Sequence, residues 1–184
     1  MNNKLQELAA EIARQREKLL QVIAGLSQQQ LDFQPSPDSW SIGEVLHHLF
    51  LIESYISKMA ARLLARAQEK GIGPDPESEG SALHSLDHLR EVTSQNKFKA
   101  IPQTAPRPGM AKKELLDSLE SSREELRKVI TEAAKYNLNQ LVFPHPYLGE
   151  FNLYQWILFT GRHEQRHRGQ IRGIVENPAF PKRE

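Results

Sequence analysis

Four long segments place apolar residues three and four positions apart, which is the spacing of one face of an α-helix. They cover residues of about 3–26, 41–68, 112–136 and 152–176. Helices of about 24 residues are each about 36 Å long and can pack as a four-helix bundle. No segment shows the sustained alternation of strands joined by hairpin turns. We therefore predict an all-α fold, with residues 1–184 forming a single domain.

One connection in this predicted bundle is much longer than the others. Residues 69–111 separate the second helical segment from the third and are rich in Gly and Pro. Connections of this length inside a compact domain are usually functional or partly disordered. The pattern predicts one short helix within it, over residues 82–95. We therefore expect a bundle with one long crossover connection.

Composition excludes several kinds of site. The chain has no cysteine, so disulfides, cysteine-held zinc, iron–sulfur clusters and cysteine nucleophiles are excluded. The 24 basic and 23 acidic residues leave a net charge of +1, which gives no electrostatic footprint for nucleic acid. No apolar run approaches the roughly 20 residues that a membrane span needs. We expect a cytoplasmic protein that binds neither nucleic acid nor membrane, and any metal must be held by His, Asp or Glu.

The fourth segment contains two histidines one helical turn apart, His163 and His167, with Glu164 between them. On a helical wheel, His167 projects near the middle of the apolar stripe, and His163 and Glu164 lie on either side of it. Each buried imidazole needs a polar partner, because an unpaired buried polar group costs about 1–3 kcal/mol. A shared divalent cation satisfies both rings at once, which favours a metal site over two histidines satisfied by separate hydrogen bonds.

These residues also spell H-E-x-x-H, the signature of zinc proteases. Such a protease needs a further ligand downstream, but only seventeen residues follow His167 and none is a histidine. The acidic residues there, Glu176 and Glu184, lie at or beyond the predicted helix end. The chain also lacks the strands that would line a peptide substrate. We interpret the motif as a coincidence.

The second helical segment offers a third ligand. His48 projects at the edge of its apolar stripe, whereas His47 points away and is predicted to face solvent or a partner. Three ligands on two helices, His48, His163 and His167, leave at least one coordination position open. An open position is typical of a catalytic metal, because structural zinc sites are closed by four protein ligands. It can hold water or a thiolate.

Other polar residues have simpler interpretations. His84 and His88 are four apart but have no third ligand, so we read them as ordinary residues of the short helix. His145 is bracketed by prolines in a predicted turn, where it packs the loop or lines the mouth of the site. Glu44 follows Ser41 by three residues and predicts a capping box. Glu53 is predicted to be a charge on the helix flank.

Two stretches together resemble a known family. "DSWSIGEVLHHL", followed far downstream by "HPYLGEFNLYQWILFTGRHEQRHRGQI", is similar to the DinB-like superfamily, which includes YfiT-type metal-dependent hydrolases and bacillithiol transferases. The residues that match the family pattern are Trp40, Ser41, His48, Leu49, His145, Pro146, Gly149, His163 and His167. We expect Trp40 itself to pack against the end of the bundle.

The resemblance implies an up-down-down-up four-helix bundle, a three-histidine site for zinc or nickel, and frequent homodimers. Characterised relatives activate a low-molecular-weight thiol, so we expect a metal-dependent thiol S-transferase acting on small electrophiles. Basic residues at the mouth, with Arg107, Lys112 and Arg166 as candidates, would suit a thiol that carries a carboxylate. We look for substrate selection in residues 69–111, the most individual part of the chain.

Two alternatives stay open at this point. One is a metal-dependent hydrolase that uses water bound to the metal, with Glu164 or His145 as a proton shuttle. The other is a non-catalytic protein that binds a metal or a small molecule. The resemblance gives the site more firmly than the reaction.

Overall fold

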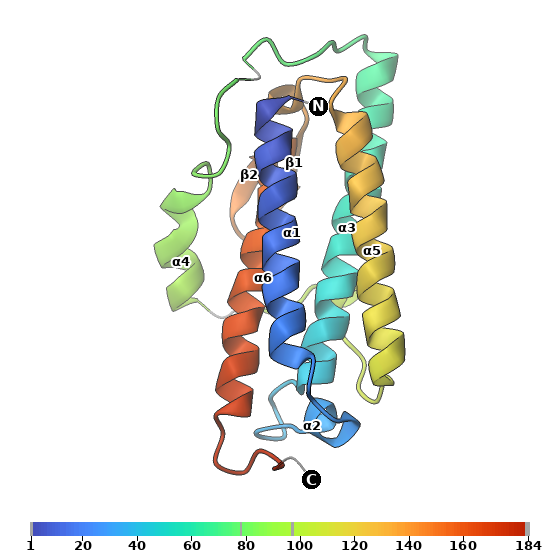
Figure 1. Ribbon diagram of the computed structural model, residues 1–184. Helices are drawn as coiled ribbons and strands as arrows, with labels where there is room; N and C mark the ends of the chain where they lie inside the picture. The colour runs from blue at the N-terminus through green and yellow to red at the C-terminus, as the bar shows by residue number, and fades with distance from the viewer. Residues whose placement is uncertain (1, 78, 97, 183–184) are drawn as a thin grey trace.

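Four long helices lie side by side along one axis (Figure 1). The computed structural model describes residues 2–77, 79–96 and 98–182. The long helices are α1 (Asn3–Ile23), α3 (Ile42–Glu69), α5 (Lys112–Ala133) and α6 (Leu153–Val175). Helices α1 and α6 run in one direction, and α3 and α5 run in the other. The predicted four-helix bundle with a long crossover between its second and third helices is confirmed.

Side-chain caps explain where three of these helices begin. Asn2 accepts a hydrogen bond from the backbone N–H of Leu5. Ser41 and Glu44 form the predicted capping box at the start of α3, and Asn152 forms a similar box with Gln155 at the start of α6. Each cap satisfies N–H groups that the first turn of a helix leaves unpaired.

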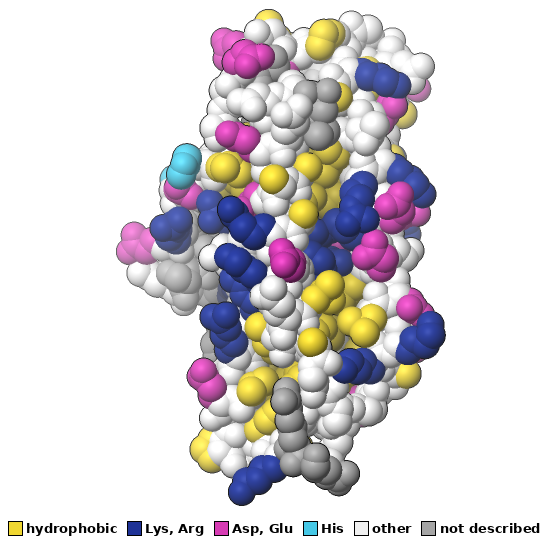
Figure 2. All heavy atoms as spheres, in the orientation of Figure 1, with side chains coloured by type: hydrophobic (Ala, Val, Ile, Leu, Met, Phe, Trp, Pro, Cys, Tyr) yellow, Lys and Arg dark blue, Asp and Glu magenta, His cyan; other side chains and the backbone are white. Residues whose placement is uncertain are grey.

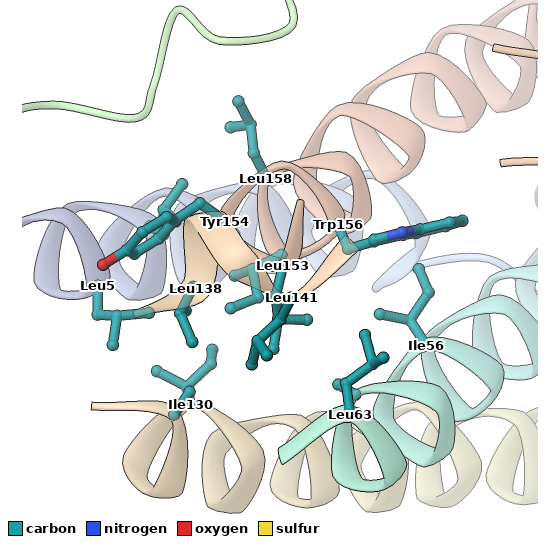
Figure 3. Packing of buried hydrophobic residues seen from close by; sticks show 14 of the residues in the cluster. Leu5, Ile56, Leu63, Ile130, Leu138, Leu141, Leu153, Tyr154, Trp156 and Leu158 are labelled. Atoms are coloured by element: carbon teal, nitrogen blue, oxygen red, sulfur yellow. The ribbon is translucent and has the colours of Figure 1, made fainter. Parts of the chain in front are cut away.

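The apolar faces meet in two clusters, one in each half of the bundle. In the half that holds the N-terminus, side chains from α3, α5 and α6 point into a common space (Figure 3). This cluster includes Leu5, Ile56, Leu63, Ile130, Leu153 and Trp156. The cluster in the other half includes Leu19, Ile42, Leu46, Leu119 and Ile171. Burial of such side chains is the main force holding the helices together.

A small β-hairpin precedes α6, and the sequence pattern did not reveal it. Strand β1 (Val142–His145) pairs antiparallel with β2 (Gly149–Asn152), and His145 lies opposite Gly149. Gly149 has a φ of +87°, a conformation that side chains other than glycine rarely adopt. Strands of four residues are too short to show a period of two in the sequence. His145 is therefore part of a strand and not of an irregular turn.

The first helix ends earlier than predicted. Helix α1 stops at Ile23 and not at residue 26, and a separate short helix, α2 (Gln28–Asp32), follows it. Ser27 caps α2 in a capping box with Gln30. The apolar period continues through Leu26 because that side chain is buried from the turn between the two helices.

The crossover runs down the outside of the bundle, and its helix α4 lies beside α6 (Figure 1). The helix predicted over residues 82–95 is shorter and less regular. A turn over 83–86 leads into the 3-10 helix η1 (Asp87–Leu89) and then α4 (Arg90–Gln95). A second 3-10 turn, η2 (Pro102–Thr104), packs on α3. The crossover therefore forms a wall along part of the bundle.

The outer face shown in Figure 2 carries charges of both signs. Basic and acidic side chains interleave across its middle, and hydrophobic side chains show above and below them. No single sign of charge dominates this face, in agreement with the net charge of +1. Within the described part of the chain, no helix has both the length and the apolar character needed to cross a membrane.

Candidate metal centre

The structure brings the three predicted ligands together. His48 comes from α3, and His163 and His167 come from successive turns of α6. One ring nitrogen from each lies within 4.8 Å of the other two, and Nε2 of His48 is 3.0 Å from Nε2 of His163. His48 and His167 are only 4% and 8% exposed. The two helices thus hold three imidazoles in a cluster that is largely shielded from water.

Hydrogen bonds fix which ring nitrogen is free in His48 and His167. Nδ1 of His48 lies 2.7 Å from the carbonyl oxygen of Thr104. A carbonyl can only accept, so Nδ1 carries the proton and Nε2 keeps a lone pair. Nδ1 of His167 lies 2.8 Å from Oε1 of Gln170, which sets the same tautomer. Metal-binding histidines commonly donate their second N–H in this way.

Burial keeps the rings neutral. It lowers the pKa of His48, lowers that of His163 well below its ordinary value, and lowers that of His167 to about 3. Loss of hydration is the largest cause for each, and the neighbouring imidazoles add to it for His163 and His167. The cluster therefore presents unprotonated nitrogens at neutral pH.

This donor set fits a divalent transition metal. Zinc binds histidine nitrogens at about 2.0–2.1 Å, which places two ligands of a tetrahedral site about 3.3 Å apart. The 3.0 Å separation between His48 and His163 is close to this value. Neutral imidazoles suit zinc and nickel. His48, His163 and His167 are the residues that would hold the ion.

A cavity of about 700 Å³ opens onto the cluster. Its walls come from α3, the crossover, the hairpin and α6, and the three histidines form part of its lining. Much of the remaining wall is apolar or aromatic, including Ile52, Tyr55, Ile56, Phe151, Trp156 and Phe159. Ligand sites in proteins are typically of this size and character, about 300–1,000 Å³. The cluster thus lies in a chamber that can hold a small molecule.

The charged residues of the cavity are mostly basic. Among the described residues, four basic side chains line it against one acidic side chain, Asp87. Arg162 donates to Asp87 and to a crossover carbonyl, so its charge is partly compensated. Arg166 donates to the carbonyl of Asn96 and lies over the ring of Phe98, 5.9 Å from its centroid. The excess of positive charge favours an anionic group on a bound molecule.

Only one of the three basic residues proposed for the mouth lies there. Arg166 lines the cavity, whereas Arg107 and Lys112 do not. Arg107 pairs with Glu114 at 2.9 Å. Lys112 donates to carbonyls at the end of α1 through its side chain. Their positions depend on the path of the crossover, which residue spacing does not give.

His145 also lines the cavity. Its ring centroid is 4.9 Å from that of Phe159, and Phe159 in turn is 5.1 Å from His163. Nδ1 of His145 accepts a hydrogen bond from the backbone N–H of Tyr147 at 3.2 Å. Burial lowers the pKa of His145 to about 4. The structure thus places His145 beside the histidine cluster, one aromatic ring away.

Comparison with known proteins agrees with this architecture. Residues 11–171 match the DinB superfamily. The chain belongs to that superfamily. It is 32% identical over 155 residues to the uncharacterized protein YuaE of Bacillus subtilis strain 168, which covers 84% of this chain and 88% of that protein.

Two solved structures resemble this DinB-superfamily chain. One is TT2238, a four-helix bundle protein, with a TM-score of 0.63 and 18% identity, covering 92% of this chain and 98% of that one. The other is an uncharacterised protein from Escherichia coli UTI89, with a TM-score of 0.54 and 15% identity, covering 99% and 98%. At these identities the likeness concerns the fold alone.

Glu164 does not join the histidines of this DinB-superfamily protein. It is 2% exposed but does not line the cavity. Its carboxylate accepts from Nε of Arg16 at 2.5 Å and lies 3.4 Å from Nη2 of Arg123. Glu53 accepts from the same two arginines and is 3% exposed, so the prediction of a charge on the helix flank is wrong. Glu164 lies at the side of the apolar stripe of α6, where a helical wheel does not decide whether a side chain faces the cavity or the bundle interior.

These four residues form an ion layer across the middle of the bundle. It is defined by Arg16, Glu53, Arg123 and Glu164, one from each long helix, and it lies between the two apolar clusters. A signal for it exists in the sequence. In α1, α3 and α5, each charge follows a buried apolar residue by four positions and precedes another by three. A charge within a buried stripe on every helix, with signs that cancel, indicates such a layer.

His47 and Trp40 have surroundings that differ from expectation, whereas His84 stays apart from the cluster as predicted. His47 is outside the cluster, as predicted, but it is only 8% exposed, because Nδ1 accepts the backbone N–H of Arg107 at 3.0 Å. Trp40 lies beside the site, with its ring centroid 4.9 Å from that of His48. His84 is exposed and pairs with Asp87 at 2.8 Å, away from the histidine cluster.

Proposed function

We propose that this protein is a metal-dependent S-transferase that joins a small anionic thiol to an apolar electrophile. The observation that carries the proposal is the cluster of three neutral imidazoles in the wall of a largely apolar cavity with an excess of basic residues. The chain has no cysteine of its own, so the thiol must come from outside. Relatives that the sequence resembles use thiols in this way.

In this proposal, different residues of the cavity bind the metal, the thiol and the electrophile. His48, His163 and His167 hold the ion, and their neutral state makes their lone pairs available. Bound there, zinc or nickel would favour thiolate over thiol, and thiolate is the nucleophile. Arg166 supplies a positive charge for a carboxylate on the thiol. The apolar walls exclude water from the electrophile, and the thiol proton leaves to solvent as the new carbon–sulfur bond forms.

The geometry favours transfer over hydrolysis. A hydrolase needs a proton acceptor beside the histidines, and Glu164 and His145 were the two candidates. Glu164 is held by Arg16 in the ion layer, outside the cavity. Nδ1 of His145 already accepts the N–H of Tyr147, so this nitrogen is not free to take a proton. The carboxylate that lines the described part of the cavity, Asp87, is already paired with Arg162 and His84.

The first test is metal and thiol binding. Purified protein is loaded with zinc, nickel or cobalt, and its metal content is measured by elemental analysis. We expect glutathione at millimolar concentration to produce a sulfur-to-cobalt charge-transfer band, and we expect His163→Ala to lose both metal and band. The loaded protein is then assayed for thiol loss with electrophiles and for cleavage of esters. Ester cleavage without any thiol effect would overturn the proposal in favour of a hydrolase.

A charge-matched pair of variants tests the role of Arg166. Hydrogen bonds to charged groups contribute about 1.5–3 kcal/mol, so Arg166→Gln should weaken glutathione binding by roughly tenfold or more. Binding of uncharged 2-mercaptoethanol should not change. Arg172 is an exposed arginine on the same helix that does not line the cavity, so Arg172→Gln is the control. Equal effects of the two substitutions would show that net charge, and not this residue, attracts the thiol.

A further inference from the structure

His145 stands within a group of aromatic side chains that we name the aromatic chamber. Its walls are Phe151, Trp156 and Phe159, whose ring centroids lie 5.2, 5.4 and 4.9 Å from that of His145. All four residues line the large cavity. None of the three walls carries a charge. Flat aromatic faces favour a planar apolar group stacked or set edge-on between them.

The chamber presents one hydrogen-bond donor that the protein does not use. Nδ1 of His145 accepts the N–H of Tyr147, so in the neutral ring the proton is on Nε2. Burial lowers the pKa of His145 to about 4, which keeps the ring neutral at physiological pH. The other N–H of the chamber, Nε1 of Trp156, already donates to the carbonyl of Phe143 at 3.0 Å. Among the described residues, Nε2 of His145 has no acceptor.

This donor lies close to the histidine cluster. Phe159 contacts both sites, since its ring centroid is 4.9 Å from that of His145 and 5.1 Å from that of His163. A molecule whose polar end meets His145 is therefore separated from His163 by the width of one aromatic ring. The same cavity holds both groups. One small ligand can thus contact the donor and reach the place where the thiol is expected.

The chemistry of the chamber selects the polar end of that ligand. A single neutral N–H suits a neutral acceptor such as a carbonyl oxygen. A charged group would lose hydration in an apolar chamber without gaining a partner of opposite charge. We infer that the electrophile is a conjugated carbonyl compound with a flat apolar body, such as an enone, whose oxygen accepts a hydrogen bond from Nε2 of His145. This substrate class rests on the proposed S-transferase function, whereas the carbonyl site does not.

The reaction balances without an oxidant or a leaving group. The thiol loses its proton to solvent, and the sulfur forms a bond to the β-carbon of the enone. The electron pair of the carbon–carbon double bond moves toward the carbonyl oxygen, which becomes an enolate oxygen. The N–H of His145 stabilises the charge that develops there. A proton from solvent then returns to the α-carbon and gives the saturated thioether.

Binding to metal-free protein tests the carbonyl site alone. The probes are 2-acetylnaphthalene and 2-ethylnaphthalene, which have similar shapes but differ in the carbonyl, and titration is followed by calorimetry. We expect wild-type protein to prefer the ketone by roughly tenfold, which corresponds to about one hydrogen bond. His145→Phe should bind the hydrocarbon as before and lose the preference. Equal affinity for the two probes in the wild-type protein would overturn the inference.

Two further variants serve as controls for the binding experiment. His145→Gln keeps an N–H donor and should retain part of the preference for the ketone, which a purely structural role for the histidine would not predict. His84→Phe replaces an exposed histidine outside the cavity and should change neither affinity. Circular dichroism spectra confirm that each variant is folded. Loss of the preference in His84→Phe would contradict the assignment to His145.

Turnover separates this inference from the proposed function. Metal-loaded protein is given glutathione with benzylideneacetone, an enone, or with benzyl chloride, which has no carbonyl. His145→Phe should lower the ratio of the enone rate to the chloride rate by about 100-fold, the effect of removing one donor to a developing oxyanion. Reaction with the chloride alone would overturn the enone class while supporting the transferase. Selective ketone binding without any transfer would support the carbonyl site and overturn the proposed function.

Discussion

The ion layer and the histidine cluster are both buried polar groups, and α6 contributes to both through neighbouring residues. Glu164 points into the bundle and meets two arginines, so its charge is compensated by the protein itself. His163 points to the cavity, where its Nε2 faces Nε2 of His48. The first arrangement has a donor for each acceptor, whereas in the second the Nε2 atoms of two neutral imidazoles face each other. A buried polar group that the protein leaves incomplete is the one that indicates a ligand.

The two sites also differ in what their loss should do. The ion layer links all four helices at one level between the apolar clusters, so it is tied to folding. The cluster is built on two helices, and His48 joins it to the crossover through one hydrogen bond to the Thr104 carbonyl. We therefore expect changes in the ion layer to appear in stability and changes in the cluster to appear in binding. The predictions below test this division.

The largest effect is expected from breaking the ion layer. Arg123 is 2% exposed and contacts both Glu53 and Glu164. Arg123→Ala leaves two buried carboxylates with Arg16 as their one remaining arginine, and breaking a buried ion pair costs about 3–5 kcal/mol of unfolding free energy. Urea unfolding of the metal-free protein measures this loss of unfolding free energy. Arg127→Ala on the exposed side of the same helix is the control and should cost less than about 1 kcal/mol. Equal losses of unfolding free energy in the two variants would show that the ion layer contributes no more to stability than a surface ion pair.

Metal should stabilise the protein through the cluster only. A ligand that binds the folded state at a free concentration of 100 times its Kd adds about 2.7 kcal/mol of stability. We expect zinc to raise the melting temperature of the wild-type protein and of Arg127→Ala, measured by calorimetry. His48→Ala should show no such rise, and its metal-free stability should fall by about 0.5–1.5 kcal/mol, because the hydrogen bond to the Thr104 carbonyl is lost. A full rise in His48→Ala would place the metal elsewhere.

Acid should act on the metal-free cluster with a defined sign. The pKa of His167 is about 3 in the folded protein and about 6.5 in the unfolded chain, so the unfolded state binds more protons between these values. Stability from the neutral ring is complete above pH 6.5 and is lost as the pH falls. One such histidine accounts for about 1.4 kcal/mol by pH 5.5. Urea unfolding of wild-type protein and His167→Gln should diverge by this amount, and parallel curves would contradict it.

The smallest effect is expected at His47, which lies next to a ligand but outside the cluster. His47→Ala removes the acceptor for the N–H of Arg107, and one hydrogen bond contributes about 0.5–1.5 kcal/mol. Metal content should stay at the wild-type level. Elemental analysis of His47→Ala beside His48→Ala makes the comparison. Metal loss of equal size in both variants would show that the helical-wheel assignment of the ligand is wrong.

Helical periodicity predicted the four long helices and one of the choices between candidate metal ligands. The stripe on each segment gave the four helices, and its phase selected His48 over His47 as a member of the cluster. The ion layer was also readable in principle, because Arg16 and Arg123 interrupt buried stripes with the spacing of core residues. Helix geometry relates residues one to eight positions apart, and these inferences all lie within that reach.

Contacts across the crossover could not be predicted in this way. The bond between His48 and Thr104 joins residues 56 positions apart, and the bond between His47 and Arg107 joins residues 60 apart. Both depend on the path of an irregular chain, which has no period. The hairpin escaped detection because its strands are short. The identity of the metal, the thiol and the predicted homodimer stay predictions, since no contact within one chain tests them.

The carbonyl of Thr104 belongs to the same crossover whose neighbouring residues wall the cavity. One segment therefore fixes the orientation of a metal ligand and shapes the space that a substrate enters. A relative that gained or lost residues here would change its substrate range and the electron-donating strength of His48 together. Exchange of this loop between homologues would consequently alter the metal site as well as the substrate cavity. Engineers who want a new substrate range would do better to vary side chains around a retained Ile101–Thr104 turn.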